Sequence, residues 1–79
     1  MKETLLYLVR QLVDHPEDVV IEETEAQDRH MLHIHTHPED MGKVIGKSGR
    51  IIRAIRDLMK VLAAKRAIYV DVEITEEAH

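Results

Sequence analysis

Four consecutive residues, Gly46-Lys47-Ser48-Gly49, combine the residue types that hold an anion. A glycine at each end lets the backbone turn sharply and keeps a Cβ out of the way of an approaching ligand. Lys47 supplies a cation and Ser48 a hydroxyl. A helix beginning near Arg50 would point its free backbone N–H groups and the positive end of its dipole at the same place. The segment therefore predicts a site for a phosphate chain.

The charge of the chain is divided along its length. Its net charge is −4, yet eight basic residues against one acidic residue give +7 for residues 43–66, whereas residues 1–42 carry −7 and residues 67–79 carry −4. A solvated helix face would produce such a run without any ligand. Because the basic run coincides with the glycine loop, we interpret it as the electrostatic footprint of a surface that binds a polyanion.

Hydrophobic periodicity and turn residues predict the elements of the first half. Apolar residues recur at helical spacing over residues 5–13, and Pro16 closes this helix. Residues 19–25 are rich in β-branched side chains and residues 31–37 alternate between apolar and polar, so both segments are predicted strands. A polar turn at residues 27–30 would join them. We therefore expect an amphipathic helix followed by a β-hairpin.

The second half places the glycine loop between two helices. Pro38 suits the first position of a helix, whose short apolar face ends at Gly46. Beyond the loop, apolar residues from Ile51 to Leu62 form a wide stripe with basic residues opposite, which predicts a longer helix. Alternation over residues 68–75 predicts a final strand with one buried face. The predicted order is helix, strand, strand, helix, glycine loop, helix, strand.

This order, with Ile-Gly-x-x-Gly at the junction of the two later helices, resembles the type II KH fold. The match covers essentially the whole chain, and residues 38–50 and 54–56 are similar to the bacterial KhpA family of small single-KH proteins. The resemblance implies an α+β fold, with helices packed on one face of a three-stranded sheet and residues 1–79 forming a single KH domain. It implies that single-stranded RNA lies in a groove between the second and third helices and a neighbouring strand.

The resemblance also assigns the residues that would contact RNA. The glycine loop would grip the sugar-phosphate chain, and Arg50 and Arg53, one turn apart, would extend the phosphate contacts. Aliphatic residues beside the loop would line the groove for bases, although such residues at helical spacing are usually buried in a core. The full expected set is Lys43, Val44, Ile45, Gly46, Lys47, Ser48, Gly49, Arg50, Ile52 and Arg53.

Pairing with another KH domain is a further expectation. The resemblance implies a homodimer, or a heterodimer with a KH protein of the KhpB (Jag, EloR) type, and an RNA chaperone role linked to cell growth, division and shape. The residues themselves indicate spare apolar surface on the third helix. The side chains that widen it beyond one core-facing stripe are Ala54, Met59, Val61, Ala63 and Ala64. A small core without Phe or Trp also favours oligomerisation.

Other classes of function match these residues only in part. Residues 42–48 look like a phosphate-binding Walker loop, but one residue is missing between the glycines and a helix, not a strand, precedes them. No nucleophile or acid/base pair stands out, so we expect no enzyme. Two alternatives stay open: a helix-turn-helix reader of duplex DNA, and a protein-interaction module that acts mainly through a KH partner.

Alternating histidines raise the question of a metal site. His33, His35 and His37 follow one predicted strand and would project from the same face, where imidazoles two residues apart can share zinc. The opposite face carries Leu32 and Ile34, so we expect the histidines in solvent, with no metal and no cofactor. The chain has no cysteine and no long apolar stretch, and we expect a cytoplasmic protein without a membrane span.

Overall fold

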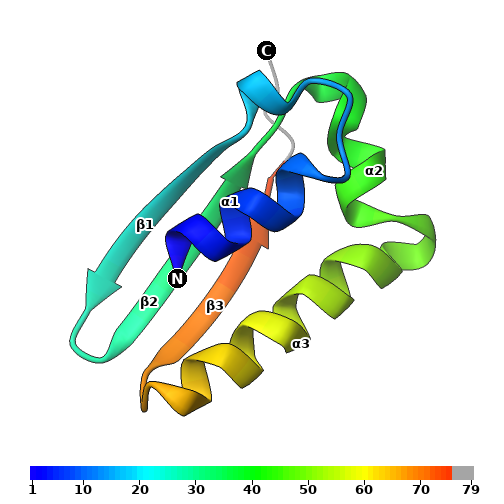
Figure 1. The fold of residues 1–79 in the computed structure, drawn as a ribbon. Helices are drawn as coiled ribbons and strands as arrows, with labels where there is room; N and C mark the ends of the chain where they lie inside the picture. Colours follow the sequence, from blue (N-terminus) through cyan, green and yellow to red (C-terminus); the bar gives the residue numbers. More distant parts are fainter. Residues whose placement is uncertain (76–79) are drawn as a thin grey trace.

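A three-stranded sheet carries the helices on one face (Figure 1). The computed structural model describes residues 1–75. β1 (Val20–Ala26) and β2 (Arg29–His35) pair antiparallel, and β2 pairs in parallel with β3 (Tyr69–Ile74), so β2 is central. The parallel pair requires a long crossover, and α2 (Met41–Ile45) and α3 (Arg50–Lys65) occupy it. This mixed α+β architecture confirms the predicted fold class and element order.

The first helix, α1 (Lys2–Arg10), is shorter than its periodicity predicts. Leu12 and Val13 still pack against the core, but they do so from the segment that follows the helix. The chain leaves the helical path there because the backbone N–H groups of Asp14 and His15 donate to the carboxylate of Asp40. A contact far along the sequence therefore overrides local helical spacing.

The hairpin between β1 and β2 differs from the prediction at both ends of β2. Its turn is only Gln27-Asp28, because Arg29 already pairs with Ala26 across the strands. Gln27 adopts a φ of 58°, in the left-handed region that tight turns need. β2 then ends at His35, two residues earlier than expected, ahead of Pro38, which has no N–H to give to a sheet.

The core lies between the sheet and the helices. Alternation along the strands sends every second side chain to the helix-covered face, and β3 accordingly buries Val70 and Val72. The buried apolar residues are Leu5, Val9, Val19, Ile21, Leu32, Ile34, Val44, Ile52, Ile55, Met59, Ala63, Val70 and Val72. No helix formed by residues 1–75 is long and apolar enough to cross a membrane.

Candidate nucleic-acid interface

The glycine loop joins α2 to α3 through an unusual backbone. Gly46 has φ 77° and ψ 170°, a region that is essentially reserved for glycine. Ser48 and Gly49 follow in the left-handed region, with φ values of 57° and 72°. The N–H of Gly49 donates to the carbonyl of Gly46 at 3.1 Å and closes the turn. The loop is therefore a defined turn in which Lys47 and Ser48 are exposed.

The two glycines serve different purposes. A Cβ at Gly46 would lie 2.5 Å from Cγ1 of Ile51, so the first glycine is required by packing inside the protein. A Cβ at Gly49 would meet nothing within 4 Å, so the second glycine is required only by its backbone angle. The space at Gly49 is open, so a ligand backbone can approach there.

Exposed cations belong to the loop and to the first turn of α3. Lys47, Ser48, Arg50 and Arg53 are all exposed. In the part of the chain that the structure describes, residues 1–75, their side chains have no hydrogen-bond or ion-pair partner. Three unpaired positive charges and a hydroxyl therefore gather at the loop and the first turn of α3, as the sequence predicts for a phosphate-binding surface.

Lys43 differs from these cations because it is already engaged. Its Nζ lies 3.1 Å from Oδ2 of Asp14 and 3.7 Å from Oδ1 of Asp40. The hydrogen bond to Asp14, together with the negative charge of both carboxylates, raises the pKa of Lys43. Lys43 was expected among the RNA contacts, but its ammonium group holds the segment after α1 against the start of α2.

Asp40 anchors the base of α2, a role that sequence reasoning missed. Its carboxylate is fully buried and accepts the backbone N–H groups of Asp14 at 3.2 Å and His15 at 2.9 Å. Oδ2 also lies 3.1 Å from Nδ1 of His15. Burial acts to raise the pKa of Asp40, but these hydrogen bonds outweigh it and lower the pKa, and the bond to Asp40 raises the pKa of His15.

The aliphatic residues beside the loop divide into core and surface. Val44 is fully buried and Ile52 is 6% exposed, so both belong to the core and support the site from beneath. Ile45 is only partly buried and packs at the margin of the core. Of the three residues expected to line a groove for bases, Ile45 is therefore the one whose side chain reaches the surface.

Arg56 fixes α3 against the edge of the sheet. Its Nε donates to the backbone carbonyl of Val72 at 2.8 Å. β3 is an edge strand, and such a bond occupies a carbonyl that would otherwise lack a partner. The basic residues of α3 thus include one with a structural role, while Arg50 and Arg53 stay available at the loop end.

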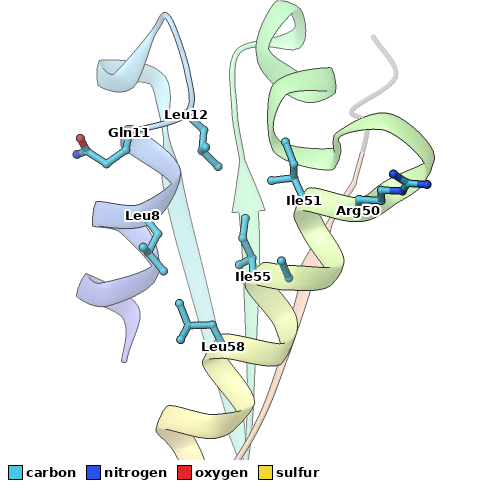
Figure 2. A pocket seen from close by; sticks show the side chains of 8 residues that line it. Leu8, Gln11, Leu12, Arg50, Ile51, Ile55 and Leu58 are labelled. Atoms are coloured by element: carbon cyan, nitrogen blue, oxygen red, sulfur yellow. The ribbon is translucent and has the colours of Figure 1, made fainter.

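An apolar groove runs between α1 and α3 (Figure 2). Figure 2 shows Leu8 and Leu12 on one side facing α3, whose Leu58 is 43% exposed. The groove is lined by Leu8, Gln11, Leu12, Arg50, Ile51, Ala54, Ile55 and Leu58. Of the residues expected to form spare surface, Met59 and Ala63 are instead buried, whereas Ala54, Val61 and Ala64 are exposed.

The histidines do not form the single row that the sequence suggested. His33 and His35 stack at 4.7 Å on the open face of the sheet, where carboxylates of Glu73 and Glu22 approach them. His37 lies beyond the end of β2, so the expectation that it shares this face is wrong. Its ring stacks instead on His15, with centroids 4.0 Å apart.

The fold and the loop together define the class of protein. A helix, a β-hairpin and two helices joined by Gly-x-x-Gly, followed by a parallel third strand, make a KH domain of the type II arrangement. The model of the KhpA/KhpB KH domain family matches residues 2–74, and the chain belongs to this family.

Curated relatives are similar in sequence to this chain over nearly their whole length, and each of the three described below is named RNA-binding protein KhpA. The protein of Clostridium perfringens is 47% identical over 74 residues, which cover 94% of this chain and 99% of the relative. That of Oceanobacillus iheyensis is 45% identical over 76 residues, 91% of this chain and 99% of the relative. That of Chlamydia pneumoniae is 42% identical over 77 residues, 98% and 99% of the two chains. No solved structure matches the chain.

Proposed function

We propose that this protein binds single-stranded RNA by clamping the sugar-phosphate backbone with the Gly46-Lys47-Ser48-Gly49 loop. The observation that carries the proposal is the loop itself, which presents a cation and a hydroxyl beside open space at Gly49. The name that the relatives share supports RNA as the polyanion. The family membership gives no reason to expect catalysis.

The chemistry of the clamp follows from the exposed groups. A phosphate approaching Gly49 meets no side chain, and Lys47 supplies the pairing charge while the Ser48 hydroxyl donates a hydrogen bond. Arg50 and Arg53 lie one helical turn apart and engage the next phosphates along the strand. Ile45 offers an apolar edge for a base, and Val44 and Ile52 hold that edge in place from the core.

Such a contact set favours broad binding. Phosphate contacts fix register and orientation but carry little sequence information, and the described loop offers no aromatic ring for stacking. Three cations on a single strand give modest affinity. Broad binding of modest affinity suits a protein that acts on many RNAs. We therefore propose that this protein is an RNA chaperone.

Pairing of two domains would strengthen this binding. The exposed apolar residues of α3 supply a surface, since Leu58 is 43% and Val61 is 60% exposed. We propose that a second copy, or a KhpB-type KH protein, covers this face. Two loops on one RNA raise the apparent affinity through effective concentration without any new contact.

The duplex-DNA alternative is not favoured. α2 has only five residues, too few for the supporting helix of a helix-turn-helix, and the loop after it is built from positive-φ residues. The parallel pairing of β3 beside β2 and membership of a KH family point the same way.

The test is a salt series of binding to a short unpaired RNA. The loop variant is Lys47→Asp with Ser48→Asp, and the matched control is Lys2→Asp with Thr4→Asp. Both change the charge by −3, and the control residues are exposed in the first turn of α1, where acidic residues are tolerated. Circular dichroism confirms that each variant is folded.

We expect the wild type and the control to show a log–log salt slope of about −2, since each of three neutralised phosphates contributes about −0.7 on a single strand. The loop variant should lose both the binding and the slope. Equal binding by the loop variant and the control would contradict the clamp and favour a protein that acts mainly through its KH partner. A competition between unpaired RNA and duplex DNA tests the helix-turn-helix alternative, which a preference for the duplex would support.

A further inference from the structure

The chain contains the tetrapeptide His-Pro-Glu-Asp twice, at residues 15–18 and 37–40. Each copy forms a short 3-10 turn, η1 (Pro16–Asp18) and η2 (Pro38–Asp40), with its histidine at the N-cap. The fold brings the two turns together, so that the rings of His15 and His37 stack with centroids 4.0 Å apart and planes 13° from parallel. The two copies of the tetrapeptide are therefore in contact through their histidine rings.

Glu39 completes a group of potential metal ligands at this junction. One ligand atom each of His15, His37 and Glu39 can be chosen so that all three lie within 4.8 Å of one another. The histidines are half-buried and the glutamate is exposed, so an ion has access from solvent. Two imidazole nitrogens with one carboxylate oxygen form a donor set that Zn²⁺ accepts. We propose that His15, His37 and Glu39 bind a zinc ion.

The buried carboxylate of Asp40 orients His15 as a metal ligand. Its buried carboxylate oxygen Oδ2 lies 3.1 Å from Nδ1 of His15 and is itself fixed by the backbone N–H of His15. When Nδ1–H donates to this carboxylate, Nε2 of His15 keeps the lone pair that a metal needs. Carboxylates in this position orient metal-binding histidines and raise their basicity. The hydrogen-bond partner of a zinc ligand is thus already in place.

His37 sets a limit on the affinity. Its Nδ1 accepts the backbone N–H of Glu39 at 3.1 Å, which leaves the proton of the neutral ring on Nε2. Zinc binding at either nitrogen of His37 ends this hydrogen bond, because a metal on Nε2 moves the ring proton to Nδ1. One of the two stacked rings must also turn, so that a nitrogen lone pair of each reaches the same ion. Three protein ligands also leave a fourth position for water. We therefore expect weaker binding than at closed four-ligand sites.

The position of the ion would matter for the rest of the fold. It would join the segment after α1 to the turn that leads into α2, and α2 ends at the glycine loop. An ion that binds the folded chain and not the unfolded chain stabilises the folded state by mass action. Zinc would therefore hold together the two segments that precede and follow the hairpin, and its binding is tested without any RNA.

The experiment titrates the untagged, metal-free chain with Zn²⁺ by isothermal calorimetry and follows the melting temperature with and without the ion. The site variants are His37→Gln and Glu39→Gln. The matched control is His33→Gln with His35→Gln, which removes the other stacked pair of histidines on the open face of the sheet. We expect one equivalent of zinc, a higher melting temperature, at least tenfold weaker binding in each site variant and unchanged binding in the control.

Three results would overturn the site: no saturable binding by the wild type, wild-type affinity in either folded site variant, or loss of binding in the control. Far-UV circular dichroism shows whether a variant is folded. If His37→Gln disturbs the fold through its lost cap, Glu39→Gln decides the question alone, because it removes only an exposed carboxylate and leaves the Glu39 backbone N–H in place.

Discussion

Alanine at the two loop glycines should have very different effects on stability. Gly46 occupies a backbone region that is essentially restricted to glycine, and its new Cβ would lie 2.5 Å from Cγ1 of Ile51. Gly49 lies in the ordinary left-handed region, and its Cβ would meet nothing within 4 Å. The first substitution thus adds both backbone strain and a steric clash, whereas the second adds backbone strain alone.

The expected losses of unfolding free energy differ between the two variants. At Gly46 the backbone region costs about 1–3 kcal/mol, and overpacking against Ile51 costs about 1–3 kcal/mol more. At Gly49 the left-handed conformation costs about 1–2 kcal/mol. The lower entropy of the unfolded alanine chain affects both variants equally and cancels in the comparison. We therefore expect Gly46→Ala to be less stable than Gly49→Ala by about 2–3 kcal/mol.

Urea unfolding followed by circular dichroism measures this difference. With a denaturant slope of about 1 kcal/mol/M for a small domain, the midpoint of Gly46→Ala should lie about 2–3 M below that of Gly49→Ala. Truncating Ile51 to Ala removes the contacts with Cγ1 and Cδ1 but leaves the Cβ of residue 51 at 2.8 Å, so the penalty at Gly46 should fall only in part in that background. Equal midpoints for the two glycine variants, or no relief from Ile51→Ala, would refute the packing role assigned to Gly46.

Three further predictions concern the anchor, the apolar face and the edge of the sheet. The pKa of His15 is raised above its ordinary 6.5 by Asp40, so this pair contributes stability that is fully present below pH 6.5 and is lost as the pH rises through the folded pKa; His15→Gln should flatten urea midpoints over that range. Val61→Glu should reduce self-association in analytical ultracentrifugation, and an unchanged oligomer would remove α3 from the interface. Arg56→Ala loses the bond to the Val72 carbonyl and should cost about 1 kcal/mol of unfolding free energy, whereas an unchanged midpoint would show that water replaces it.

The sequence predicts the element order and the place of the loop because both depend on local patterns. The alternation in β3 reports its buried face and glycine spacing marks the turn, whereas the apolar stripe of α3 is wider than the face that is buried, since Ile51 and Leu58 stay exposed. The family resemblance then supplies the three-stranded sheet with its helices on one face. The parallel pairing of β2 and β3 is known from the structure, because no local pattern in the sequence encodes it.

The anchor around Asp40 could not be read from the sequence. Its partners, Asp14 and His15, lie 26 and 25 residues away, and an acidic residue after Pro38 looks like an ordinary first-turn residue. The same segment shortens α1, and the carboxylates of Asp14 and Asp40 engage Lys43, which the sequence placed among the RNA contacts. The early end of β2 had a signal in Pro38, but the stacking of His37 on His15 depends on tertiary structure.

An NMR titration of the ¹⁵N-labelled chain with a short unpaired RNA shows whether RNA contacts the glycine loop. We expect the amide signals of residues 46–50, and that of Arg53, to shift first and to saturate together. The amides of His33 and His35 on the open face of the sheet should stay in place. Shifts that concentrate on the open face, with the loop signals unmoved, would contradict the clamp.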